Sequence, residues 1–82
     1  MKDGYYINDK GIKIIIPADT KKLNLSFKNL VEIVCNSELE ELVCHNNQLN
    51  KLILNDKLSY LKCDINTKLE NINSNTKIYL YE

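Results

Sequence analysis

The stretch LEELVCHNNQL, residues 39–49, carries the pattern that decides the fold. The triplet Leu-x-x-Leu-x-Cys begins at Leu39 and recurs from Leu58, with all three positions shifted by the same 19-residue step. A motif that returns at a fixed period indicates structurally similar units, each of which buries its apolar face against its neighbours. The chain should therefore be a stack of coils.

A second apolar series with the same period lies between the copies of the first, as Leu30-x-x-Ile33-x-Cys35 and Leu49-x-x-Leu52-x-Leu54. Two series predict two short extended segments in each coil. One set is expected at residues 14–16, 33–35, 52–54 and 72–74, and the other at residues 23–25, 42–44, 61–63 and 78–80. Because side chains alternate along a strand, the first and third residues of each segment should point inward.

A helix does not explain the central stretch, because Cys44, Asn47 and Leu49 leave the helical stripe that Leu39 and Leu42 would share. The N-terminal residues 5–16 instead predict a β-hairpin whose turn is Asn-Asp-Lys-Gly, residues 8–11. We therefore predict one all-β domain, residues 1–82. It is a short parallel β-solenoid of about four 19-residue coils, residues 18–82, with an N-terminal β-hairpin cap, residues 1–17.

The composition excludes several classes of protein. Eleven Lys balance eleven acidic residues and there is no Arg, which disfavours direct binding of nucleic acid. No apolar run is long enough for a membrane span, and the N-terminus has no apolar segment typical of a signal peptide. Three Cys, an odd number, favour reduced thiols in the cytoplasm.

The pattern Leu39-x-x-Leu42-x-Cys44-x-x-Asn47-x-Leu49 resembles the conserved segment of a leucine-rich repeat. The chain is similar to short bacterial or viral repeats of this kind in which the convex side is extended. The resemblance implies a protein-binding scaffold whose binding surface lies on the strands.

Chemical sites are weakly supported by the sequence. Cys44 and His45 are neighbours on a strand and should point to opposite faces, which disfavours a catalytic dyad. Cys44 and Cys63 should stack in adjacent coils, but no C-x-x-C pair completes a zinc site. We expect no enzyme, no metal and no cofactor, although a thiol or metal site using Cys44, Cys63 and His45 remains an alternative.

The outward residues are the candidates for binding. On one face, Ile15, Val34 and Ile53 should form an apolar ribbon that the N-terminal strand, a second copy in a homodimer, or another protein would cover. On the other face, the 19-residue step aligns Tyr60 with Tyr79 and Lys62 with Tyr81. The candidate contacts of this second face are His45, Tyr60, Lys62, Asp64 and Tyr79.

The expected function is non-catalytic protein–protein interaction, in which rigid strands present outward side chains at about 4.8 Å intervals. One alternative is a small inhibitor, of the kind that a phage or virus encodes, that blocks a host or defence enzyme such as a nuclease.

Overall fold

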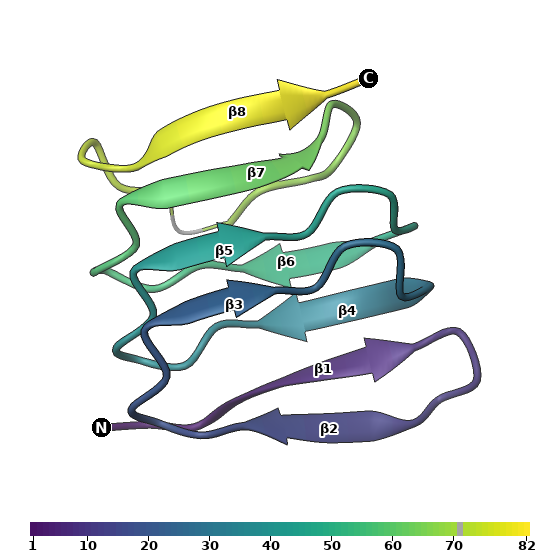
Figure 1. Ribbon diagram of the computed structural model, residues 1–82, viewed down its shortest axis with the longest axis horizontal. Coiled ribbons are helices and arrows are strands. Elements are labelled where there is room, and N and C mark those ends of the chain that lie inside the picture. The colour runs from purple at the N-terminus through teal and green to yellow at the C-terminus, as the bar shows by residue number, and fades with distance from the viewer. Residues whose placement is uncertain (71) are drawn as a thin grey trace.

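The computed structural model describes residues 1–70 and 72–82, which form two four-stranded sheets. Sheet A has the order β2-β1-β4-β6, with bounds Lys13–Ile16, Gly4–Asn8, Leu30–Val34 and Lys51–Ile53. Sheet B has the order β3-β5-β7-β8, with bounds Lys22–Asn24, Glu41–Val43, Tyr60–Asp64 and Lys77–Tyr81. The chain alternates between the sheets as it climbs, and so forms an all-β solenoid of about three turns (Figure 1).

Sheet B is parallel throughout and keeps the predicted period over its first three strands. Leu23 pairs with Leu42, and Leu42 pairs with Leu61, so both steps equal the predicted period. The last step is two residues shorter, because Leu61 pairs with Ile78 and not with Leu80. Residues 61–63 therefore face residues 78–80 as predicted, although the full period does not extend to β8.

Sheet A departs from the prediction at the N-terminal end. The β1–β2 hairpin forms around the expected turn, where Asn8 Oδ1 accepts hydrogen bonds from the N–H groups of Lys10 and Ile12. However, β1 lies between β2 and β4 and is antiparallel to both. The expectation that residues 14–16 stack directly on residues 33–35 was wrong, because the hairpin's first arm occupies that place.

The other departure is at residues 72–74, which do not form the expected strand. Sheet A instead continues past β6 through a single parallel bridge between Ile53 and Glu70, so this step is also two residues shorter than the period. Leu54 donates its N–H to the Glu70 carbonyl at 3.1 Å. The last coil is thus shortened by the same amount on both sides of the solenoid.

The core lies between the sheets and consists of the inward residues of both series. Eleven of its members form one buried cluster: Leu25, Leu30, Ile33, Leu39, Leu42, Cys44, Leu52, Leu54, Leu58, Leu61 and Cys63. Leu39 and Leu58, the first positions of the repeated triplet, are buried at the corners where the chain passes from sheet A to sheet B. Every position of the triplet is therefore a core position, which explains why the motif is apolar at all three.

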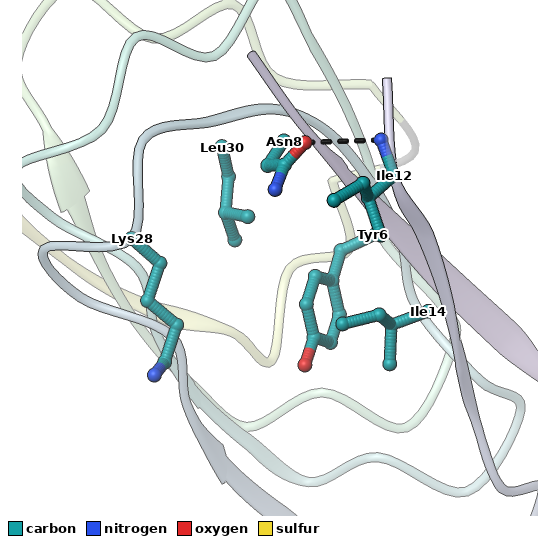
Figure 2. Close-up of a pocket in the computed structure, with 6 residues that line it drawn as sticks. All are labelled: Tyr6, Asn8, Ile12, Ile14, Lys28 and Leu30. Atoms are coloured by element: carbon teal, nitrogen blue, oxygen red, sulfur yellow. Dashed lines mark hydrogen bonds between the residues drawn. The ribbon is translucent and has the colours of Figure 1, made fainter. Parts of the chain in front are cut away.

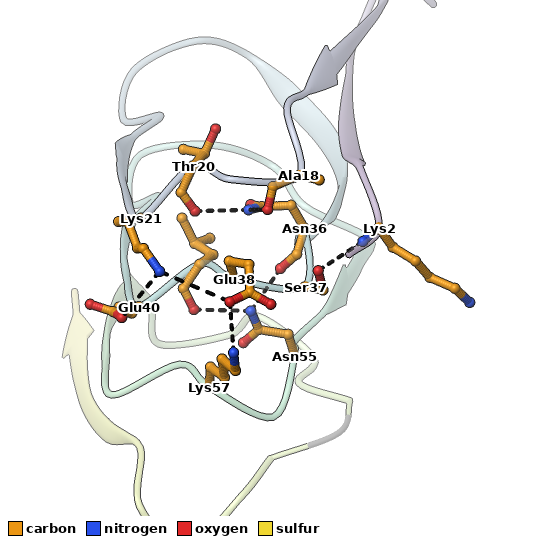
Figure 3. Close-up of polar contacts among 11 residues, drawn as sticks. Lys2, Ala18, Thr20, Lys21, Asn36, Ser37, Glu38, Glu40, Asn55 and Lys57 are labelled. Atoms are coloured by element: carbon orange, nitrogen blue, oxygen red, sulfur yellow. Dashed lines mark hydrogen bonds and ion pairs between the residues drawn. The ribbon is translucent and has the colours of Figure 1, made fainter.

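Asparagine side chains support these corners from coil to coil. Asn55 Nδ2 donates to the carbonyl oxygens of Asn36 and Leu39 in the coil before it, at 2.7 and 2.9 Å. Asn36 makes the same kind of contact with Ala18 and Thr20 (Figure 3). Carbonyl groups that the tight corner leaves without a strand partner are satisfied in this way. Asn36 and Asn55 therefore have a structural role at these corners.

Candidate protein-binding surfaces

The outer face of sheet A carries an apolar column with an unexpected member. Tyr5 of β1 pairs with both Ile15 and Val34, and Val34 pairs with Ile53. The predicted ribbon of Ile15, Val34 and Ile53 is therefore interrupted by a tyrosine. The N-terminal strand joins the sheet edgewise, so it does not cover this face.

Charged groups surround the phenol of Tyr5 on the same face. Its hydroxyl donates to Glu32 Oε2 at 2.5 Å, and Lys51 Nζ lies 3.7 Å from the same oxygen. Lys13 Nζ lies 4.3 Å from the centre of the Tyr5 ring. The hydrogen bond to Glu32 raises the pKa of Tyr5, because the carboxylate accepts the phenol proton and disfavours its loss. The polar side chains of this face are thus bound to one another around Tyr5, and the apolar residues Ile15, Val34 and Ile53 lie beside them.

On sheet B the shortened last coil changes which outward residues are neighbours. Tyr60 pairs with Lys77, Lys62 with Tyr79, and Asp64 with Tyr81. The predicted pairings of Tyr60 with Tyr79 and of Lys62 with Tyr81 were two residues out of register. Tyr60 and Tyr79 nevertheless touch along a diagonal, with ring centres 5.2 Å apart in an edge-to-face arrangement.

A second aromatic group lies at the end of the sheet B strands. The ring of His45 stacks on Tyr81 with centres 4.5 Å apart and an angle of 10° between the planes. Phe27 contacts His45 edge-on at 5.5 Å, although its side chain is 70% exposed. Lys62 Nζ lies 5.4 Å from the centre of the Tyr81 ring. The three rings form one continuous group, in which Phe27 and Tyr81 are exposed and His45 is half buried.

We call the rings of Phe27, His45, Tyr60, Tyr79 and Tyr81 the aromatic surface. Asp64, which was predicted as a contact, lies partly buried beside it and has a structural role. Its two carboxylate oxygens accept the N–H groups of Asn46 and Asn47, so they hold the turn that follows His45. Four of the five predicted residues of this face lie in or beside the aromatic surface: His45, Tyr60, Lys62 and Tyr79. The Asp64 carboxylate is hydrogen-bonded to the turn after His45.

Sequence reasoning missed Phe27 as a contact and placed Tyr81 only in a column. Phe27 has a positive φ of 57° and lies one repeat period before Asn46, whose φ is 59°. Both residues turn the chain at the same corner, and this corner conformation presents Phe27 to solvent. The sequence does not reveal this corner, because a phenylalanine rarely adopts the left-handed conformation.

A cleft of about 300 Å³ lies at the N-terminal end, lined by Tyr6, Asn8, Ile12, Ile14, Lys28 and Leu30 (Figure 2). Asn8 uses its side-chain oxygen within the hairpin turn. Among these lining residues only Tyr6 and Lys28 can ionise, and neither is paired with a second titratable group of the lining. The cleft therefore lacks the convergent acid and base groups that hydrolytic or transfer chemistry needs.

The cysteines are free thiols: Cys44 and Cys63 are buried in the core, and Cys35 is half buried against it. Burial raises the pKa of Cys35 to about 12, and burial is also the main reason why the pKa values of Cys44 and Cys63 are raised. A raised pKa keeps the thiol protonated, whereas the thiolate is the nucleophile and the metal ligand. Within residues 1–70 and 72–82 no three His, Cys, Asp or Glu side chains are grouped so that they could hold a metal ion.

The described part of the chain contains no helix that is long and apolar enough to cross a membrane. Comparison with known proteins gave no matching family model, curated protein or solved structure.

Proposed function

We propose that this protein is a non-catalytic protein-binding module and that the aromatic surface of sheet B is its binding site. The observation that carries the proposal is the aromatic group in which the half-buried His45 ring contacts two exposed residues, Phe27 edge-on and Tyr81 by stacking. Aromatic side chains are enriched among residues that dominate binding energy, because they combine a large apolar area with few rotatable bonds. An exposed aromatic group of this kind on a small domain favours an interaction site.

Rigidity supports the same proposal. Tyr60 and Tyr79 stand on central and edge strands of a hydrogen-bonded sheet, and the turn beneath His45 is held by Asp64. Side chains that are already ordered lose less entropy when a partner binds. The leucine-rich-repeat resemblance points in the same direction, since it implies a binding surface on the strands.

The competing surface is the outer face of sheet A. Ile15 on this face is exposed, but Val34 and Ile53 are half buried, and the charges of the face are satisfied by one another. A partner would have to compete with the Glu32–Lys51 ion pair and with the Glu32–Tyr5 hydrogen bond. We therefore rank sheet B above sheet A, and the cytoplasmic, inhibitory and homodimeric expectations stay predictions.

The test is comparative capture. The immobilised protein is exposed to lysate beside two variants: Phe27→Asn with Tyr81→Ser on sheet B, and Val34→Lys with Ile53→Lys on sheet A. Asparagine at position 27 tolerates the positive φ, so the corner is preserved. Circular dichroism verifies that each variant is folded.

We expect partners that the unaltered protein captures to be lost only from the sheet B variant. Loss from the sheet A variant alone would move the site to that face, and equal capture by all three proteins would overturn the proposal. If a captured protein is an enzyme, its activity with and without added protein tests the inhibitor alternative directly.

A further inference from the structure

The four strands at the sheet edges are protected to different degrees. On sheet A, β2 ends before Pro17, which has no N–H to offer a further strand, and β6 is followed by the bridge to Glu70. On sheet B, β3 has three residues and carries Lys22 directly after Lys21. Short strands, prolines and lysines are the usual means of preventing edge-to-edge pairing. Strand β8 carries one lysine, Lys77 at its start, but it is five residues long, contains no proline and has only uncharged residues from Ile78 to Tyr81.

The main-chain groups of Ile78 and Leu80 face the outer edge of β8. Their neighbours in the strand face the other way: Lys77 donates its N–H to the Ser59 carbonyl, and the Tyr81 carbonyl accepts the N–H of Ile65, so Lys77 and Tyr81 bond toward β7. Residues alternate in the side to which they bond within a parallel ladder. The N–H and C=O groups of Ile78 and Leu80 therefore point away from β7, and β8 is the last strand of the described sheet.

The side chains of the same two residues form an incompletely covered apolar end. Ile78 and Leu80 are inward positions, since they pair with Leu61 and Cys63. Leu80 is 52% exposed although Cys63 beside it is fully buried. Ile72, 54% exposed, belongs to the same last coil. Within residues 1–70 and 72–82, these apolar side chains are thus half covered, and no strand pairs with the outer edge of β8.

We propose that β8 pairs in antiparallel fashion with β8 of a second copy of this chain, about a two-fold axis through Tyr79. Centring on Tyr79 pairs all five residues of the strand, which no other register does. It sets Ile78 opposite Leu80 of the second copy, so that the inward side chains cover each other. The free N–H and C=O groups of these residues form two hydrogen-bonded pairs, each with two hydrogen bonds.

Charge favours this arrangement over head-to-tail stacking. The antiparallel register sets Lys77 opposite Tyr81 of the second copy, where an ammonium and an aromatic ring attract each other. A continued parallel stack would instead pair β8 with β3 of the next copy. The outward column would then place Lys77 beside Lys22, and like charges directly opposite are destabilising. The two-fold interface also closes, whereas stacking would produce an open fibre.

The proposed dimer does not depend on the proposed partner. It makes sheet B continuous across the axis, and its outer side keeps both aromatic surfaces exposed side by side. Failure of partner capture would leave the dimer intact, and a monomeric protein could still capture a partner. The interface is small, which predicts a dissociation constant in the micromolar range.

Sedimentation velocity of the unaltered protein, from about 1 μM to about 1 mM, measures the dimer directly. We expect the mass to rise from monomer to dimer over this range and to stop there. Leu80→Lys should weaken the dimer about tenfold or more, because each copy would bring a charge into the covered end. The matched control is Ile65→Lys, which adds the same charge at a residue of 53% exposure outside β8 and should leave the dimer unchanged.

The register has its own test. Tyr79→Cys places a thiol opposite itself in a non-hydrogen-bonded pair, where Cα atoms are about 4.5 Å apart, within reach of a disulfide. Exchange with oxidised glutathione, which is reduced to two molecules of glutathione for each disulfide formed, should give a covalent dimer. Tyr60→Cys, on the same outward face but on β7, should stay monomeric on denaturing gels.

A monomer at every concentration, or equal loss of dimer with Leu80→Lys and Ile65→Lys, would overturn the proposal. Equal cross-linking of both cysteine variants would overturn the register.

Discussion

Asp64 holds the main chain of Asn46, in the preceding coil, through a hydrogen bond of 2.7 Å from the Asn46 N–H to Asp64 Oδ1. The second carboxylate oxygen accepts the N–H of Asn47 at 3.1 Å. One side chain on a strand end thus fixes the turn of the coil before it, which has a positive φ at Asn46. The contact links the stacking of the coils to the position of His45.

Asp64→Ala should lower the free energy of unfolding by about 1–3 kcal/mol, because two turn N–H groups lose a charged acceptor. Asp64→Asn should recover part of the loss, since it retains one side-chain oxygen. Urea denaturation followed by circular dichroism measures both, with the exposed Asp56→Ala as the control. If Asp64→Ala is as stable as Asp56→Ala, these hydrogen bonds do not support the turn.

Asn47 and Asn66 occupy the same position one coil apart but have different surroundings. Asn47 Oδ1 accepts the N–H groups of Lys28 and Leu30, and its Nδ2 donates to the Leu25 carbonyl at 2.8 Å, while Asn66 is exposed. Asn47→Ala should cost about 2–4 kcal/mol of stability and Asn66→Ala less than about 0.5 kcal/mol. Equal denaturation midpoints for the two variants would contradict this assignment.

Gly4 allows β1 to approach β4. A Cβ at this position would overlap the Val34 carbonyl oxygen and would lie 2.5 Å from the Asn36 nitrogen, both of which are main-chain atoms. Gly4→Ala should therefore destabilise the protein by about 3 kcal/mol or more, because the hairpin must move away from the sheet. Gly11→Asn is the control, since position 11 has φ +80° but open space around it, and it should cost less than about 1 kcal/mol. Thermal unfolding of the two variants gives the comparison.

The thiols should react slowly in the native protein. With a pKa of about 12 instead of 9.0, Cys35 holds about a thousandfold less thiolate at neutral pH than an ordinary cysteine. Labelling with a thiol-specific reagent should be correspondingly slow, should accelerate only at strongly alkaline pH, and should reach three groups when urea is added. Added Zn²⁺ should leave the unfolding temperature unchanged. Rapid labelling or a shift with zinc would instead favour the thiol or metal alternative.

The sequence predicted the parts of the fold that depend on the repeat. The alignment of Leu23, Leu42 and Leu61 follows directly from the 19-residue period, because parallel coils of equal length place equivalent residues side by side. The period could not predict that β1 lies between β2 and β4. Ile14 and Ile33 are also one period apart, and a hairpin arm with apolar alternation looks the same in sequence as a coil segment.

The candidate site was predictable only in part, for a related reason. The side chains of Tyr60, Lys62 and Tyr79 point outward because strand side chains alternate, and this holds whatever the register. Which of them touch depends on the last coil, where a step shortened by two residues shifts β8 against β7. Phe27 reaches His45 through a corner in the left-handed conformation, which a phenylalanine rarely adopts and therefore does not signal in the sequence.

The regular 19-residue step between β5 and β7 has a consequence for protein engineering. Residues 39–57 form one complete period, and the corner amides of Asn36 and Asn55 lie in equivalent places near its two ends. Tandem duplication of this segment should lengthen the solenoid by one coil, while the N-terminal hairpin and β8 keep their present neighbours. Residues 39–57 could therefore serve as a repeat module for scaffolds with different numbers of coils.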